Sequence, residues 1–186
     1  MNFQTQVPTA AILGPALLIF ALFALARRRG NVPGWRGGPL VLRALTAIYA
    51  AGVVSVTSFP LWIYGGGYRN EAPWTSQIQP IPLLTADISM IPNVVMFVPL
   101  GFLLPLLSHR LTSRRTVAVC ALASLGIELA QLLQYIALAH GRAVDINDLI
   151  ANTLGGLLGY AALRTAQRTA AARDVLNKLS PSPSTV

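Results

Sequence analysis

The chain has 186 residues, a length typical of one domain, and 54% of its residues are hydrophobic while only 11% are charged. Soluble domains carry about 25% charged residues, so this composition leaves too few charges to cover a water-exposed surface and indicates an integral membrane protein. The formal net charge is +8, but the arginines fall between apolar segments, which indicates membrane topology rather than nucleic-acid binding.

Five apolar segments follow one another along the chain and predict membrane-spanning helices. Spanning a hydrocarbon core of about 30 Å takes roughly 20 residues, and a helix satisfies its own backbone polar groups in lipid. The first and fifth segments are slightly short by this measure. The predicted fold class is an all-α integral membrane helical bundle with about five transmembrane helices, at residues 8–26, 39–64, 88–107, 116–139 and 146–163.

The basic residues predict an orientation for this bundle, because Lys and Arg gather on the cytoplasmic side of membrane proteins. Arg69 and Arg142 fall on one face, together with the acidic residues Glu71, Asp87 and Asp145 and with Asp148. We therefore expect the N-terminus outside and the C-terminus in the cytoplasm. Twelve basic residues fall on the cytoplasmic face: Arg27, Arg28, Arg29, Arg36, Arg43, Arg110, Arg114, Arg115, Arg164, Arg168, Arg173 and Lys178.

Three regions divide the chain. Residues 1–44 hold the first transmembrane helix and a basic cytoplasmic loop, and residues 45–163 form the main transmembrane domain. Residues 164–186 form a basic cytoplasmic tail, expected to be an amphipathic helix that ends in a disordered Ser/Pro-rich stretch.

Glu128 is the most unusual residue of the sequence, because it is an ionisable residue inside an apolar segment. It lies in the middle of the fourth segment, near the expected bilayer centre, where a charged side chain costs roughly 2.5–3.5 kcal/mol to insert. Ser124, Gln131 and Tyr135 are spaced to share its helical face. The fourth helix is therefore expected to carry a polar face that rises from the membrane centre toward the outside.

The fifth predicted helix also carries a polar face. Polar residues at its outer end, Asp145, Asp148 and Asn152, are followed by Gly155, Gly156 and Gly159. A short loop joins it to the fourth helix, so the two are expected to be antiparallel neighbours. At about 1.5 Å per residue, Asn152 should come level with Gln131, and Glu128 level with Gly155 and Gly156. We therefore expect the glycine face of the fifth helix to receive the polar face of the fourth.

The third helix adds Asn93, about 7–8 Å below its outer end. Pro92, Pro99 and Pro105 each remove a backbone donor and can kink this helix, which could splay its outer half and open a cavity. Three helices thus place polar groups in the outer half of the membrane on convergent faces. The predicted ligand-binding residues are Asn93, Glu128, Gln131, Arg142, Asp145, Asp148 and Asn152.

Purely structural roles are the alternative for the same residues. Asp145 is a good N-cap, and Asp148 three residues later resembles a capping box; Arg142 could pair with Asp145. Asn93, Gln131 and Asn152 could serve as interhelical hydrogen bonds. For Glu128 a functional role is favoured, because a residue that only joins helices does not need to be ionisable.

Four stretches stand in order along the chain: IQPIPLLTADIS (78–89), NVVMFVPLGFLLP (93–105), SLGIELAQLL (124–133) and GRAVDINDLIANTLGGLLGY (141–160). With their N…FxPLGF, ExxQ and RxxDxxDxxxN elements, they resemble the VanZ-like family of small multi-pass bacterial membrane proteins, over roughly residues 45–162. The family pattern falls on Asn93, Pro99, Gly101, Glu128, Gln131, Arg142, Asp145, Asp148, Asn152 and Gly156. The resemblance implies a cell-membrane location and a link to the cell envelope and to resistance to the lipoglycopeptide teicoplanin. It implies no established reaction.

Two functional hypotheses follow. In the first, a non-enzymatic envelope protein binds a polar head group with a lipid tail at an outward-facing pocket, where Arg142 would hold a phosphate or carboxylate. The ligand would be a lipid-linked cell-wall precursor, a lipoglycopeptide or a phospholipid. In the second, a membrane-embedded hydrolase or transferase acts on a lipid-linked substrate. Glu128 would be its general acid or base, and Asp145 and Asp148 weak candidates for a divalent cation.

The first hypothesis is favoured because the chain offers no Ser-His-Asp set and no histidine cluster. Cys120 is its one cysteine, so neither an intrachain disulfide nor a Cys/His metal site is expected. We expect membrane lipids as partners, no nucleic acid and no cofactor. The ligand, the reaction if there is one, and the oligomeric state stay open.

Overall fold

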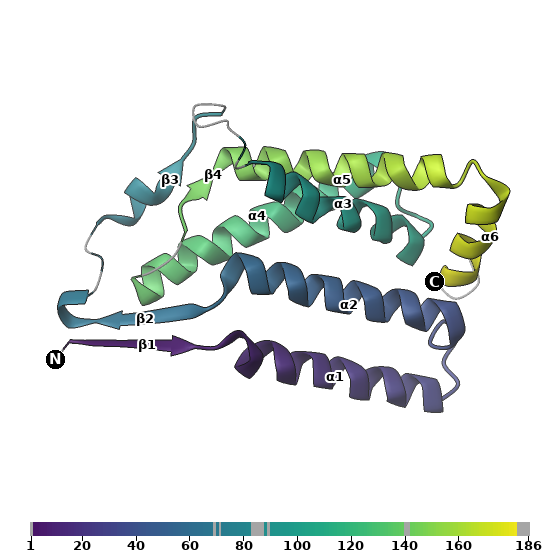
Figure 1. Cartoon of the computed structure of the whole chain (residues 1–186), viewed down its shortest axis with the longest axis horizontal. Helices are drawn as coiled ribbons and strands as arrows, with labels where there is room; N and C mark the ends of the chain where they lie inside the picture. Colours follow the sequence, from purple (N-terminus) through teal and green to yellow (C-terminus); the bar gives the residue numbers. More distant parts are fainter. Residues whose placement is uncertain are drawn as a thin grey trace.

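The structure of the protein is a computed structural model that describes residues 2–68, 70, 72–82, 88, 90–139 and 142–181. In these residues, five long helices run along the long axis of the molecule and a shorter sixth helix turns across one end (Figure 1). The all-α bundle predicted from the sequence is confirmed. The helices are α1 (Thr9–Arg29), α2 (Gly37–Ser58), α3 (Met90–Leu107), α4 (Ser113–Leu138), α5 (Ile146–Ala166) and α6 (Ala170–Leu179).

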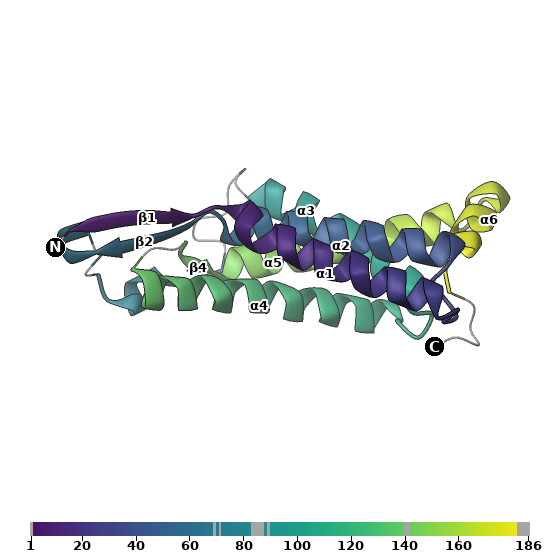
Figure 2. The same cartoon turned by 90° about the horizontal axis from the view of Figure 1, so that it is seen from below.

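Helices α1 to α5 correspond to the five predicted segments, but the second segment, predicted to reach residue 64, ends at Ser58. The residue before a proline is pushed out of the helical region, and Phe59, which precedes Pro60, is extended with φ −121° and ψ 157°. The chain continues as strand β2 (Leu61–Gly65), which pairs antiparallel with β1 (Phe3–Val7). Figure 2 shows this two-stranded ribbon and the C-terminal part of α4 extending past the other helices.

Some predictions fall on residues outside the described part of the chain. These residues are Arg69, Glu71, Asp87 and the stretch 182–186 that was expected to be disordered. The described part of the predicted tail begins inside α5 and continues as α6. Two one-turn 3-10 helices, η1 (Gly66–Tyr68) and η2 (Trp74–Gln77), follow β2.

The long helices expose apolar side chains and bury polar ones, the reverse of a soluble protein. Helix α4 is the clearest case, because Leu122, Leu125, Leu129, Leu133 and Ile136 are between 42% and 67% exposed. Its buried residues are Thr116, Cys120, Ser124, Glu128, Gln131 and Tyr135. Helices α1, α2, α3 and α4 are each long and apolar enough to cross a membrane, so the chain is a membrane protein.

Helix α5 is not among these four helices, yet it runs beside α3 along the bundle (Figure 1). The two helices approach closely through glycines: a Cβ added at Gly101 or Gly159 would lie less than 3.0 Å from the carbonyl oxygen of Gly156 or Val98, respectively. Only small residues allow backbones to come this close. A fifth membrane span and the N-outside orientation stay predictions.

The predicted fit of the glycines against the polar face of α4 is wrong for Gly155 and Gly159 and holds for Gly156. Gly155 and Gly159 face α3, while Gly156 lies against Cys120 of α4. Adjacent residues of a helix with 3.6 residues per turn point about 100° apart, so Gly155 and Gly156 cannot face the same neighbour.

The predicted depths of α4 and α5 are also wrong. Asn152 meets Ser124 rather than Gln131, a difference of roughly two helical turns. The reason is that α4 continues past the start of α5, and the chain returns alongside it as strand β4 (Val144–Asp145), which pairs parallel with β3 (Ile78–Gln79). Glu128 therefore lies beside the first turn of α5, at the predicted outer end of the bundle, and not at its centre.

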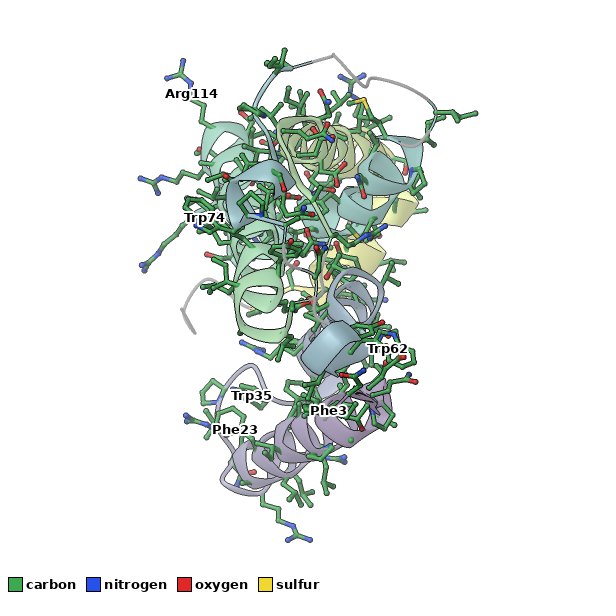
Figure 3. The ribbon with its side chains drawn as sticks, turned by 90° about the vertical axis from the view of Figure 1, so that its left-hand side faces the viewer. Phe3, Phe23, Trp35, Trp62, Trp74 and Arg114 are labelled. Atoms are coloured by element: carbon green, nitrogen blue, oxygen red, sulfur yellow. The ribbon has the colours of Figure 1, made fainter. Side chains whose placement is uncertain are left out.

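Helix α1 lies at the edge of the bundle, where it packs on α2. Among its residues only Ala24 is buried. Its Phe23 ring meets Trp35 edge-on, with ring centroids 5.1 Å apart, and Figure 3 shows this pair set apart from the body of the bundle. None of the predicted site residues lies on α1.

Candidate functional site

A cavity of about 950 Å³ lies between the C-terminal half of α2 and the N-terminal half of α3. Its walls along the two helices are mostly apolar, and its charged groups are gathered where the chain enters α5. At the level of Tyr49, the tyrosine hydroxyl donates to the carbonyl of Met96 at 2.8 Å and ties α2 to α3. The cavity is lined by Tyr49, Gly52, Val53, Val56, Pro92, Asn93, Val95, Met96, Pro99, Arg142, Ala143, Asp145 and Asp148.

The charged end of this cavity is organised by hydrogen bonds. Asn93 Nδ2 of α3 donates to Asp148 Oδ1 of α5, which joins the two helices at the cavity rim. Asp145 caps α5, because its Oδ1 accepts from the backbone N–H of Asn147 at 2.8 Å. Both carboxylates are therefore held by protein donors.

Arg142 differs from these two acids because its side chain is exposed. Within the described part of the chain its guanidinium forms no ion pair or hydrogen bond, although it acts electrostatically on Asp148. Its donors are therefore available to a ligand. Arg142 also lines a second cavity of about 360 Å³, whose other lining residues are Val56, Thr57, Ser58, Phe59, Pro60, Trp62 and Gln134.

The three remaining predicted site residues are buried between helices and do not line the large cavity. Glu128 is 3% exposed, and its Oε2 accepts from the backbone N–H of Asp145 at 3.0 Å. Gln131 Nε2 donates to the carbonyl of Thr57 at the end of α2, at 3.0 Å. Asn152 Nδ2 donates to Ser124 Oγ at 2.9 Å. These bonds join α4 to the start of α5, to the end of α2 and to the middle of α5.

The structure thus divides the seven predicted residues into two groups. One group lines the cavity: Asn93, Arg142, Asp145 and Asp148. The other group forms hydrogen bonds that join the elements around the cavity: Glu128, Gln131 and Asn152. The predicted N-cap at Asp145 is confirmed. The predicted capping box is wrong, because Glu128 of α4 accepts the N–H that Asp148 would take in that motif.

Helix α2 contributes residues to the site that the sequence pattern did not indicate. Tyr49, Gly52, Val53 and Val56 form one wall of the cavity, and Trp62 lines its smaller neighbour. The signal that could have pointed to this wall is Tyr49, a polar hydroxyl in the middle of an apolar segment. Pro92 and Pro99 line the opposite wall, whereas Pro105 lies near the other end of the bundle, where it lines a small cavity with His109 and Tyr160.

Metal ligation has little geometric support. Among the described residues, no three His, Cys, Asp or Glu side chains come together in a group that could hold a metal ion. Of the predicted pair, Asp145 caps α5 and Asp148 accepts from Asn93. The chemistry that this arrangement offers is recognition: a guanidinium, two oriented carboxylates and an amide beside an apolar wall.

Comparisons with known proteins converge on one group. The sequence profile of the VanZ/LLP1 family matches residues 41–167. Protein VanZ of Enterococcus faecium is 29% identical over 122 residues, which make up 66% of this chain and 73% of that protein. No solved structure matches the chain. The matched residues include α3, α4, α5 and every lining residue of the large cavity, and the chain belongs to the VanZ/LLP1 family.

Proposed function

We propose that this protein is a multi-pass protein of the cell membrane that binds an amphiphilic cell-envelope molecule in the cavity between α2 and α3. The ligand is a lipid-linked cell-wall precursor or a lipoglycopeptide, bound with its apolar part between the helices and its polar part at Arg142. The protein acts by binding and not by catalysis. Its similarity to Protein VanZ extends the proposal to a role in resistance to glycopeptides such as teicoplanin.

The observation that carries the proposal is the two-sided character of the cavity. Ligand pockets commonly measure about 300–1,000 Å³, and this cavity of about 950 Å³ is large enough for a bulky ligand. Val53, Val56, Val95 and Met96 offer an apolar wall, while the polar residues stand together at one end. A molecule that is apolar along most of its length and polar at one end matches this arrangement.

Arg142 supplies the main attraction for the polar part. A guanidinium binds phosphate or carboxylate through two parallel hydrogen bonds, and this side chain has no ion-pair partner in the described chain. Asp145 and Asp148 stand on the same rim and disfavour a ligand that carries negative charge alone. The rim therefore suits a head group that combines an anionic group, placed on Arg142, with amines or hydroxyls that face the carboxylates.

The second cavity gives the head group room to extend. It shares Val56 and Arg142 with the first, and it adds the hydroxyl of Ser58, the amide of Gln134 and the indole of Trp62. An indole beside polar side chains offers an apolar face and hydrogen bonds together, as a sugar or peptide group requires. Arg142 would then hold the link between an apolar chain in the larger cavity and a hydrophilic group in the smaller one.

Photo-crosslinking with a lipid-linked probe tests the proposal. Labelling of purified protein should fall at least tenfold in Arg142→Ala, since a charged hydrogen bond contributes about 1.5–3 kcal/mol. Arg114→Ala is the matched control, because Arg114 lies in the first turn of α4, is also exposed and points away from the bundle (Figure 3). Equal labelling of Arg142→Ala and Arg114→Ala would refute the proposed site.

The same preparation separates binding from catalysis. The wild-type protein should retain the lipid-linked probe unchanged after incubation with Mg²⁺ or Mn²⁺. Turnover of the probe that disappears in Glu128→Gln would instead support a membrane-embedded hydrolase or transferase.

A further inference from the structure

A second polar surface lies at the opposite end of the bundle, where α5 ends and α6 begins (Figure 1). A cavity of about 470 Å³ there is lined by Arg164, Gln167, Arg168 and Arg173. We propose that this arginine cluster binds the head group of an anionic phospholipid. The proposal is independent of the ligand at the outer cavity.

Helix α6 packs against the other helices, so the arginine cluster has a defined structure. Leu176 of α6 is buried against Leu42, Leu106 and Leu163 of three other helices. A Cβ at Gly38 would meet the carbonyl of Lys178 at less than 3.0 Å, so α6 lies directly on the start of α2. The two parts of the cluster, Arg164 on α5 and Arg173 on α6, are thereby held in a fixed relation.

The positive charge of the cluster is not neutralised from within. Within the described residues no ion pair involves Arg164, Arg168 or Arg173, and their side chains are exposed. Arg164 Nη1 donates to Gln167 Oε1 at 3.1 Å, which orients one guanidinium and leaves its other donors free. Asp174 is the nearest acid in sequence, but it is not among the lining residues. Three guanidinium groups around one cavity favour an anion with several acceptor oxygens.

The surface next to the cluster identifies the anion as a lipid head group. Leu154, Leu157 and Ala161 precede Arg164 by ten, seven and three residues, so they lie on the same side of α5. Leu154 and Leu157 are 46% and 45% exposed. An acyl chain can therefore lie along α5 while its phosphate meets the arginines. Basic pockets at the ends of membrane helices bind anionic lipid head groups in this manner.

Lipid binding by the purified full-length chain tests the proposal, with phosphatidylglycerol and diphosphatidylglycerol compared against phosphatidylcholine in native mass spectrometry. The triple variant Arg164→Gln, Arg168→Gln and Arg173→Gln should lose affinity for the anionic lipids by at least about a hundredfold, since a direct hydrogen bond from a charged donor to the phosphate contributes about 1.5–3 kcal/mol. The control is Arg27→Gln, Arg28→Gln and Arg29→Gln, which removes the same charge from exposed residues of α1. The control should change the affinity less than about fivefold.

Three results would overturn the proposal: equal losses in the two triple variants, no loss in either, or binding of inorganic phosphate that competes fully with the lipid. The single variant Arg168→Glu gives the same comparison if the triple variant does not fold. Labelling by the lipid-linked probe at the outer cavity should stay at the wild-type level in both triple variants. A failure here therefore leaves the proposed function at Arg142 untouched.

Discussion

Helix α3 is packed in opposite ways on its two sides. Toward α5, glycines bring the backbones together, so that Gly101 lies against the carbonyl of Gly156. Toward α2, the N-terminal half of α3 stands apart from the C-terminal half of α2 around a cavity of about 950 Å³. Lipid tails are as apolar as Leu side chains, so helices in a membrane are not driven together by the hydrophobic effect. A helix that is anchored on one side by close backbone contact can therefore keep an open space on its other side.

The closely packed side should be the most sensitive to substitution. Gly159→Leu places a side chain against the backbone of α3, and we expect a loss of at least about 3 kcal/mol in the free energy of unfolding, the upper range for overpacking, or no folded protein. Gly126→Leu is the matched control, because Gly126 of α4 is exposed and a Cβ there meets nothing within 4 Å. Thermal unfolding in detergent measures both, and equal stability of the two variants would show that the α3–α5 contact is not close.

Glu128 should act as the acceptor that fixes the start of α5. Glu128→Leu leaves the backbone N–H of Asp145 without this partner, which should cost about 1–3 kcal/mol. Glu128→Gln keeps an acceptor oxygen and should stay within about 1 kcal/mol of the wild type. Denaturation of both variants in detergent decides the question. If the two substitutions cost the same, the hydrogen bond to Asp145 is not what Glu128 contributes.

The bond between Asn152 and Ser124 should give the smallest effect. Interhelical hydrogen bonds in membranes contribute about 0.6 kcal/mol on average in double-mutant cycles. A cycle of Asn152→Ala, Ser124→Ala and the double variant should return a coupling energy of about this size. Additive single effects would mean that the contact does not couple α4 to α5.

Much of this architecture could be predicted from the sequence, because helix identity depends on local composition. Apolar segment lengths gave α1 to α5, and the spacing of Asp145 to the following apolar run gave the N-cap. The register between α4 and α5 could not be predicted in the same way. It depends on where the chain re-enters the bundle, and the extended segment Val144–Asp145 moved that point about two turns along α4.

The candidate site was also predictable only in part. Asn93 and Asp148 were expected at compatible depths, and they bond to each other. The α2 wall of the cavity was not expected, because Gly52, Val53 and Val56 are ordinary residues of a membrane helix. Their contribution comes from the distance between α2 and α3, which is a property of tertiary packing.

Filling the cavity tests the central claim most directly. Gly52 lines the cavity, is exposed, and has nothing within 4 Å of an added Cβ, so Gly52→Phe should occupy the space without disturbing the helices. Gly126→Phe makes the same substitution at an exposed site on α4 outside the cavity. Photo-crosslinking by the lipid-linked probe should fall at least tenfold in Gly52→Phe and stay at the wild-type level in Gly126→Phe. Undiminished labelling of folded Gly52→Phe would contradict a ligand site between α2 and α3.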